Sequence, residues 1–357
     1  MLALRRSTHI GLLLIITLVL ASCLTPTRPK VVKIGLVAPF EGHYRYIGYD
    51  AIYAARLALR EINAQDSLDG WHVELVAYDD RGSVELARNA AANLIIDPDV
   101  MAVIGHYRSE SGQAAASLYA EAGLPFIALG DSGAIDSSWH LEPEPAVLAQ
   151  AIVEVGTTLD PETAVVLGQD PVADAVRDAL EIGGVRAPSE ISQRDPNVAF
   201  DLLAPIEAAE QASQWRAEGW EGHLVGGVSL SSPAFIRIGG ESAQGAFFVT
   251  SFPFPRDVAG SQDWIAAYQA VGPHVPEPGP YALPTYEAIH LVINALDRAL
   301  TSRDEVNRSA VTGALVTAER IGRLGEIAWE SSGHWNAAPL YLYQWTGQAP
   351  RLIGQVP

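Results

Sequence analysis

Cysteine, basic residues and long apolar runs are all scarce in this chain of 357 residues. The single cysteine excludes an intrachain disulfide framework and a cysteine-rich zinc site. The 23 Lys and Arg residues are outnumbered by 42 Asp and Glu residues, which gives a net charge of −19. Because phosphate binding requires clustered basic side chains, this balance argues against a nucleic-acid-binding protein.

A short apolar run lies near the amino terminus, at residues 10–21, and Arg5 and Arg6 precede it. A membrane-spanning helix needs about 20 apolar residues, so this run is too short to cross a bilayer. A positive pair followed by a short apolar run is typical of a secretory signal peptide.

Cys23 follows this run directly, after the tripeptide Leu-Ala-Ser. This ending resembles the bacterial lipobox, in which small residues precede a cysteine that receives lipid and becomes the new amino terminus. We therefore expect residues 1–22 to be a lipoprotein signal peptide, Cys23 to be lipidated, and residues 23–30 to form a tether. The alternative is an ordinary signal peptide with Cys23 near the cleavage site by chance.

Apolar strands and amphipathic helices alternate along the rest of the chain. Residues 31–38 are rich in β-branched side chains, which is typical of a strand covered on both faces, and helical spacing follows from Ile52 to Ile62. Further strands are predicted at residues 73–78, 101–104, 126–129, 164–167, 224–228, 246–250, 326–329, 340–345 and 351–353. This order indicates an α/β fold with two doubly wound, parallel-sheet lobes.

The length of the chain allows about two domains of ordinary size. The predicted division is a first lobe of residues 31–150 and 253–331 and a second lobe of residues 151–252 and 332–357. Pro- and Gly-rich segments at residues 252–255 and 272–284 are predicted crossings between the lobes.

Patterns for metal binding and catalysis are weak. The nine histidines are scattered without a metal-binding spacing, and no phosphate-binding Gly-Lys-Ser/Thr loop is present. Residues 130–133 (GDSG) match the nucleophile tetrapeptide of trypsin-like proteases, but they follow a strand of a parallel sheet and not of an all-β double barrel. We expect no metal, no cofactor and no enzymatic activity, with a serine hydrolase using Ser132 as the alternative.

Several candidate binding residues follow the ends of predicted strands, where open α/β sheets bind ligands. Ser109 opens a helix after the third strand, so its hydroxyl and the free N–H groups of that turn suit a small carboxylate. The alternative is that Ser109 only caps this helix. Gly130 and Ser132 leave the fourth strand in the same way. Tyr44 and Tyr46, in the loop after the first strand, are candidates for lining a pocket.

Several segments in order resemble the Leu/Ile/Val-binding proteins of ABC importers. They are KIGLVAPFEG at residues 33–42, REINA at 60–64, VELVAYDD at 73–80, AVIGH at 102–106, YAEAGLP at 119–125 and GESAQG at 240–245. The resemblance covers nearly all of the chain after the signal peptide and is strongest in residues 33–130. It implies a type I periplasmic-binding-protein fold, in which two lobes joined by three crossings close around a ligand.

The resemblance also implies roles for residues of the first lobe. The Ser109 position binds the carboxylate of an amino acid through its hydroxyl. The Gly130 position contributes a backbone group, and the Ser132 position contributes a hydroxyl to the same end of the ligand. All three positions keep suitable chemistry in this chain.

The second lobe departs from the pattern of the family. Its tyrosine loop is shortened to residues 168–171, which contain no tyrosine, and a second family tyrosine falls near Ala204. The acid that pairs with the ligand ammonium in the family falls near Val228 and Ser229, and Ser229 is the second-lobe residue that we predict to bind ligand.

An ammonium group left unpaired in a closed site would cost several kcal/mol, so the missing acid needs a substitute. Glu41, Asp131 and Asp170 are the candidates from the sequence. Otherwise the ligand has no ammonium group, as in a simple carboxylate or an amide.

These observations predict an exported solute-binding lipoprotein that captures a small polar ligand, first of all a branched-chain or other amino acid. It would deliver this ligand to an ABC permease and its ATPase. We expect a monomer that is lipid-anchored at the outer face of the cytoplasmic membrane or held in the periplasm. The alternative is a ligand-sensing receptor of the same fold, for an amide or a carboxylate, that signals without transporting.

Overall fold

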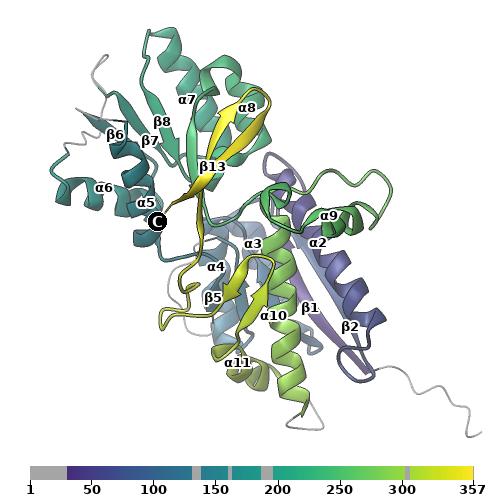
Figure 1. Cartoon of the computed structure of the whole chain (residues 1–357). Coiled ribbons are helices and arrows are strands. Elements are labelled where there is room, and N and C mark those ends of the chain that lie inside the picture. Colours follow the sequence, from purple (N-terminus) through teal and green to yellow (C-terminus); the bar gives the residue numbers. More distant parts are fainter. Residues whose placement is uncertain (1–29, 131–137, 160–162, 186–195, 302–305, 357) are drawn as a thin grey trace, which may run out of the picture.

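The chain folds into two lobes, which Figure 1 shows one above the other. The computed structural model describes residues 30–130, 138–159, 163–185, 196–301 and 306–356. Each lobe has a central sheet with helices on both faces, so the predicted α/β fold class is confirmed. Within the described ranges, no helix is long and apolar enough to cross a membrane.

The sheet of the first lobe has five parallel strands in the order β2-β1-β3-β4-β5. They are β1 (Lys30–Ala38), β2 (Trp71–Asp79), β3 (Val100–Gly105), β4 (Phe126–Ala128) and β5 (Ser138–His140). Every residue of β1 from Ile34 to Ala38 is buried, because helices cover both faces of the sheet. Since all five strands run in one direction, their carboxyl ends meet at one edge.

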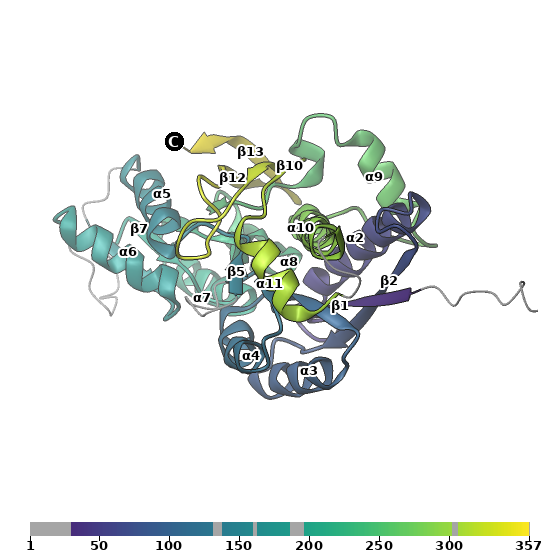
Figure 2. The same cartoon turned by 90° about the horizontal axis from the view of Figure 1, so that it is seen from below.

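Helices of the first lobe lie in two layers, which Figure 2 shows on opposite sides of the sheet. α2 (Arg45–Ala64) and α10 (Ala282–Thr301) share a large apolar core with one face. α3 (Val84–Ile96) and α4 (Ser109–Glu121) pack on the other face through alanines and Tyr119. The other elements of this lobe are α9 (Gln262–Gln269), α11 (Arg308–Val316) and the hairpin of β10 (Arg320–Gly322) and β11 (Gly325–Ile327).

The sheet of the second lobe has six strands in the order β13-β12-β9-β8-β7-β6. The parallel part is β6 (Ala164–Leu167), β7 (Val198–Asp201), β8 (His223–Gly226) and β9 (Phe247–Thr250). The predicted strands near the carboxyl terminus are observed as β12 (Leu340–Thr346) and β13 (Ala349–Val356). They form an antiparallel hairpin, and β12 extends the sheet by pairing with β9.

Two helical layers also cover the sheet of the second lobe. α5 (Pro145–Thr157) and α6 (Pro171–Ile182) pack on one face, and α7 (Pro205–Ala217) and α8 (Pro233–Gly239) pack on the other. Each of these four helices has proline in its first turn, where the missing N–H costs no hydrogen bond. The short 3₁₀ turns are η1 (Val228–Ser231), η2 (Gly240–Ala243) and η3 (Pro255–Asp257).

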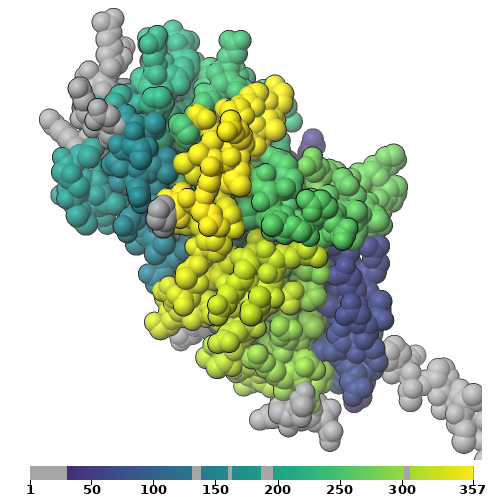
Figure 3. Space-filling model, in the orientation of Figure 1, coloured from purple at the N-terminus to yellow at the C-terminus, as the bar shows by residue number. Residues whose placement is uncertain are grey.

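Three segments connect the lobes, after β5, after β9 and between β11 and β12. Phe252 packs in the core of the first lobe and Phe254 in that of the second, so the predicted segment 252–255 lies at a crossing. Figure 3 shows the yellow carboxyl-terminal segment passing from one lobe to the other. The lobe boundary predicted between residues 150 and 151 falls inside α5. Because α5 packs in a core of the second lobe, the boundary lies before this helix.

The crossing predicted at residues 272–284 is wrong. Tyr281 and Leu283 belong to the first-lobe core. The preceding loop is fastened to α2, because the N–H groups of Gly279 and Tyr281 donate to the buried Asp50 carboxylate at 3.0 and 3.3 Å. The Pro and Gly content therefore marks a loop that folds back on its own lobe.

Candidate functional site

The lobes touch through loops that follow the carboxyl ends of their strands. Tyr46, in the first turn of α2 after β1, forms a side-chain hydrogen bond with Ser232, which precedes α8. Val228 of η1 packs against the core of the first lobe. The edge where β1 ends therefore lies against the loop after β8, so the ligand-binding edges expected for the two sheets face each other.

A buried hydrogen-bond network holds the loop that leads into α4. His106 is fully buried, and its ring nitrogens lie 3.0 Å from Asp80 Oδ2 and 3.1 Å from the Tyr119 hydroxyl. Gly105 has a φ of +131°, and a Cβ placed on it would lie 2.0 Å from the Val37 carbonyl oxygen. Only glycine fits this close approach, and the network then fixes the direction in which the chain enters α4.

Ser109 is the first residue of α4, as the sequence predicts. Helix geometry leaves the N–H groups of this first turn without partners inside the helix, and the helix dipole favours an anion there. The hydroxyl of Ser111, in the same turn, is fully buried and has no hydrogen-bond partner. The first turn of α4 therefore contains free N–H groups and an unpartnered hydroxyl that could serve as donors to a ligand. Ser111 was not recognised as a candidate in the sequence.

Gly130 lies beside this turn. A Cβ on Gly130 would lie 2.8 Å from the backbone carbon of Tyr107 and 3.0 Å from the Arg108 nitrogen, so the two loops are in direct contact. The structure thus brings Gly130 next to the segment that carries Ser109. Ser132 and Asp131 fall outside the described residues, as does the expected lipidation site Cys23.

Tyr44 and Arg108 form a stacked pair at the edge of this site. The Arg108 guanidinium lies 4.0 Å from the centre of the Tyr44 ring, and its Nη2 donates to the Glu110 carboxylate at 3.1 Å. The Nε of Arg108 is buried without a partner. Burial raises the pKa of Tyr44, and the charge of Glu207, in the first turn of α7, also acts on it. The pair therefore lies near the second lobe.

Aromatic rings form the floor beneath the first-lobe loops. Tyr281 lies at their centre, with ring centroids 6.3 Å from Tyr46, 5.8 Å from Tyr107 and 5.6 Å from Phe252. Burial raises the pKa of Tyr46 and Tyr107 above the ordinary value, so both hydroxyls stay neutral. The floor is therefore apolar with uncharged hydroxyl groups, which suits the body of an apolar or aromatic ligand.

The buried polar residues of the second lobe are gathered at one edge. Within its described elements, from α5 to β9 and from β12 to β13, they are Asp201, Ser231, Ser232, Thr250 and Ser251. All of them lie at or just beyond the carboxyl ends of three neighbouring strands, β7, β8 and β9. Two of their atoms, Asp201 Oδ2 and Ser231 Oγ, are buried without a hydrogen-bond partner. Ser229 lies in η1, half-buried beside Val228.

The acids expected to substitute for the missing acid differ in their exposure and hydrogen bonding. Glu41 is exposed in the bend after β1. Asp170 caps α6 by accepting the N–H of Ala173 at 2.7 Å, which accounts for one of its oxygens. Asp201 was missed because β7, the strand that it ends, was not predicted from the sequence.

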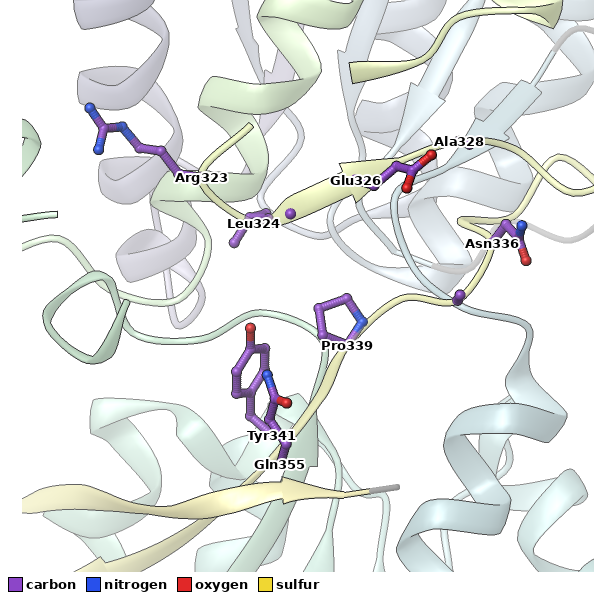
Figure 4. Close-up of a pocket in the computed structure, with 10 residues that line it drawn as sticks. Arg323, Leu324, Glu326, Ala328, Asn336, Pro339, Tyr341 and Gln355 are labelled. Carbon is purple, nitrogen blue, oxygen red and sulfur yellow. The ribbon is translucent and has the colours of Figure 1, made fainter. Parts of the chain in front are cut away.

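A separate cavity of about 480 Å³ lies at the third crossing, away from the predicted site residues. Figure 4 shows Tyr341 and Gln355 side by side across from the β11 residue Glu326, with Pro339 between them. Both lobes line this cavity, and Glu326 is exposed to solvent. Within the described ranges, no group of three His, Cys, Asp or Glu side chains is placed to hold a metal ion.

Comparison with known proteins identifies the family. The model of the family described as periplasmic binding protein matches residues 31–181 and 187–349. The chain belongs to this family. The family name places its members outside the cytoplasm, in agreement with the export predicted from the sequence.

Individual relatives confirm the resemblance to Leu/Ile/Val-binding proteins. A leucine-specific-binding protein of Salmonella typhimurium is 23% identical over 353 residues, covering 88% of this chain and 90% of the relative. The structure of a leucine-binding protein from Thermotoga maritima aligns with a TM-score of 0.79 and 20% identity, over 91% of this chain and 98% of that one.

A third relative carries a different ligand. A solute-binding protein from R. palustris, solved in complex with benzoate, aligns with a TM-score of 0.73 and 17% identity over 91% of this chain and 96% of that one. The type I periplasmic-binding-protein fold is thus confirmed. All three relatives are named as binding proteins and not as enzymes.

Proposed function

We propose that this protein binds a small polar solute between its two lobes and delivers it to an ABC permease and its ATPase. The observation that carries the proposal is the position of three unpartnered polar atoms. Ser111 Oγ, Asp201 Oδ2 and Ser231 Oγ are buried without partners, and all lie near the strand ends where the lobes face each other. Buried polar atoms normally have partners, so a bound solute is the natural supplier of them.

The site that we propose has one half on each lobe. On the first lobe, Ser109 and the free N–H groups of α4 hold a carboxylate together with Gly130 and Ser132, and Tyr44 and Tyr46 line the apolar part. On the second lobe, Ser229 and Ser231 supply hydroxyl groups. A branched-chain amino acid fits this combination of anion-binding groups and an aromatic floor.

Binding would act by shifting a population between open and closed arrangements. A ligand that contacts both lobes binds the closed arrangement better and therefore favours it. The hydrogen bond between Tyr46 and Ser232 joins the lobes directly, so it can form only when they are together. No covalent chemistry is required.

Lipid attachment at Cys23 would keep the mature protein, as a monomer, at the outer face of the membrane beside its permease. The short segment of residues 23–30 would act as the tether. The two lobes, which we propose to be the rigid units of closure, then turn about the three connecting segments.

The proposal is tested by analysing small molecules released from the purified, unheated mature protein by mass spectrometry. A thermal-shift panel of the twenty L-amino acids and simple carboxylates follows. A ligand at a hundredfold excess over its Kd stabilises the folded protein by about 2.7 kcal/mol, which gives a clear shift in Tm. Absence of any released solute and of any shift in the panel would contradict the proposal.

Two observations support a carboxylate without an ammonium group as a second candidate ligand. Val228 and Ser229, where the family acid is expected, are uncharged, and the R. palustris relative binds benzoate. Benzoate in the same panel separates the candidates, because a shift with benzoate alone would favour this second ligand class.

A further inference from the structure

Asp201 is the only acid among the buried polar residues of the described second lobe. It is the last residue of β7 and is fully buried. Its Oδ1 accepts the N–H of Leu203 at 3.1 Å, whereas its Oδ2 has no partner. A buried carboxylate with one unpaired oxygen is costly, so the structure indicates that a donor is missing beside it.

The strand that carries Asp201 adjoins the strand after which the family places its acid. β7 pairs with β8 in parallel, and Asp201 stands opposite Gly226 in the register. Neighbouring strands lie about 4.8 Å apart, so an acid at the end of β7 is one strand away from the position near Val228 and Ser229. Gly226 has no side chain that could separate the Asp201 backbone from that loop.

The charges around Asp201 favour a cation. The charge that acts on Asp201 is that of Glu207, a second acid in the first turn of α7. Among the described ion pairs, no lysine, arginine or histidine pairs with either acid. The charge of Glu207 also acts on Tyr44 of the first lobe, so this negative region extends toward the boundary between the lobes.

We propose that Asp201 pairs with an ammonium group of the ligand and thus takes over, from β7, the task of the acid that is absent after β8. The inference rests on the proposed function and narrows it. The ligand is then a zwitterion, with its carboxylate on the first lobe at Ser109 and its ammonium group on the second lobe at Asp201. Glu207 adds negative potential at longer range without direct contact.

The test compares each amino acid that binds with its deaminated analogue, for example L-leucine with 4-methylpentanoate, by isothermal titration calorimetry. The wild type should bind the amino acid at least about 100-fold more tightly than the analogue, because only the amino acid satisfies Asp201. Asp201→Asn keeps the acceptor for Leu203 but removes the charge, and should raise the Kd of the amino acid about 30-fold or more.

A matched control separates recognition from folding. Asp66→Asn makes the same change in the first lobe, where the exposed carboxylate accepts the N–H of Gly70 at 2.8 Å, and should leave the Kd unchanged. The Tm of each variant without ligand reports on folding. If Asp201→Asn folds and binds the amino acid like the wild type, or if the wild type prefers the deaminated analogue, the inference is wrong.

A pH profile gives a readout that a structural role would not change. Burial raises the pKa of Asp201 to about 7, and the negative charge of Glu207 adds to the rise. The carboxylate needed for pairing is lost below that pH, so the Kd of the wild type should rise about tenfold per pH unit there. Asp201→Asn should show a flat profile, and a wild-type profile without this rise contradicts the pairing.

The outcomes distinguish this inference from the proposed function. If no amino acid and no carboxylate binds the wild type, the proposed function fails and the inference fails with it. If an amino acid binds and Ser109→Ala weakens binding while Asp201→Asn does not, the proposed function stands and only the assignment of Asp201 is overturned.

Discussion

The two lobes differ in how the polar groups at their strand ends are held. In the first lobe, His106, Asp80 and Tyr119 form a closed buried network that fixes the loop before Ser109. In the second lobe, Asp201 and Ser231 each keep a buried atom without a partner. The comparison indicates that the loop before Ser109 is preformed, whereas Ser111 Oγ in the first lobe and two such atoms in the second are left for a ligand.

The largest expected effect comes from disturbing the preformed loop. Gly105→Ala would place a Cβ against the Val37 carbonyl oxygen at an unfavourable φ, and should lower the free energy of unfolding by about 4 kcal/mol. Urea denaturation followed by circular dichroism measures this loss. Gly313→Ala is the control, because its Cβ meets nothing within 4 Å in the interior of α11 and should stabilise slightly. Equal stabilities would show that the loop before Ser109 is not rigid.

The next largest effect concerns pH and compares one buried acid from each lobe. Burial raises the pKa of Asp50 and of Asp201 to about 7. The folded state therefore holds these protons more tightly than the unfolded chain, so this contribution to stability is complete below about pH 4 and is lost as the pH rises through 7. Each group should account for a loss of about 2–4 kcal/mol.

Urea midpoints measured between pH 4 and 8 check this dependence. Asp201→Asn should remove the part of this pH-dependent loss of stability that comes from the second lobe. Asp50→Asn should remove the part that comes from the first lobe. Glu41→Gln is the control, since Glu41 is exposed and its charge change should leave the pH profile as in the wild type. If the stability of the wild type stays level or rises from pH 4 to 7, the raised pKa of these two acids is contradicted.

A smaller effect is expected for the anion-binding turn. Ser109→Ala removes a hydroxyl from the first turn of α4 and should weaken ligand binding by about 1–3 kcal/mol if Ser109 meets a charged group. Calorimetry with the ligand found in the panel measures the change. Ser83→Ala, at the start of α3 in the same lobe, should bind like the wild type. Unchanged affinity in Ser109→Ala removes this residue from the site.

The smallest effect probes the contact between the lobes. Tyr46→Phe removes the hydrogen bond to Ser232 while keeping the aromatic floor, and should lower ligand affinity by about 1 kcal/mol because the closed arrangement is less favoured. Small-angle X-ray scattering should then show a larger radius of gyration at partial saturation. Tyr53→Phe, on the same helix but packed against Tyr268, serves as the control. Identical affinities for wild type and Tyr46→Phe would show that this bond does not contribute to closure.

The first four strands of the first lobe could be predicted because their signals are local, whereas β5 was missed. The β-branched run at β1 and the start of α4 at Ser109 follow from side chains that are neighbours in the sequence. The loop at residues 272–284 could not, because its hydrogen bonds end on Asp50, which is 229 positions from Gly279. Pro and Gly content shows that a segment is not a helix or strand, but it does not show which lobe the segment packs on.

The candidate site was predicted in part for the same reason. Strand ends followed by Ser109 and Gly130 are visible along the chain, and the structure brings these two segments into contact. Asp201 was overlooked, since the short strand β7 that it ends was not predicted and an acid is more often exposed than buried. It ends an inner strand of the sheet, between β8 and β6, and only the tertiary structure shows this position.

The sequence by itself determined the alternation of strands and helices, the family, and the edge of each sheet where a ligand would bind. These features depend on the period and order of side chains along the chain. Only the tertiary structure decided which polar atoms at those edges are satisfied and which are left for a ligand. That difference arises because burial removes water from a polar group, whereas its hydrogen-bond partner must come from residues distant in the sequence or from the ligand.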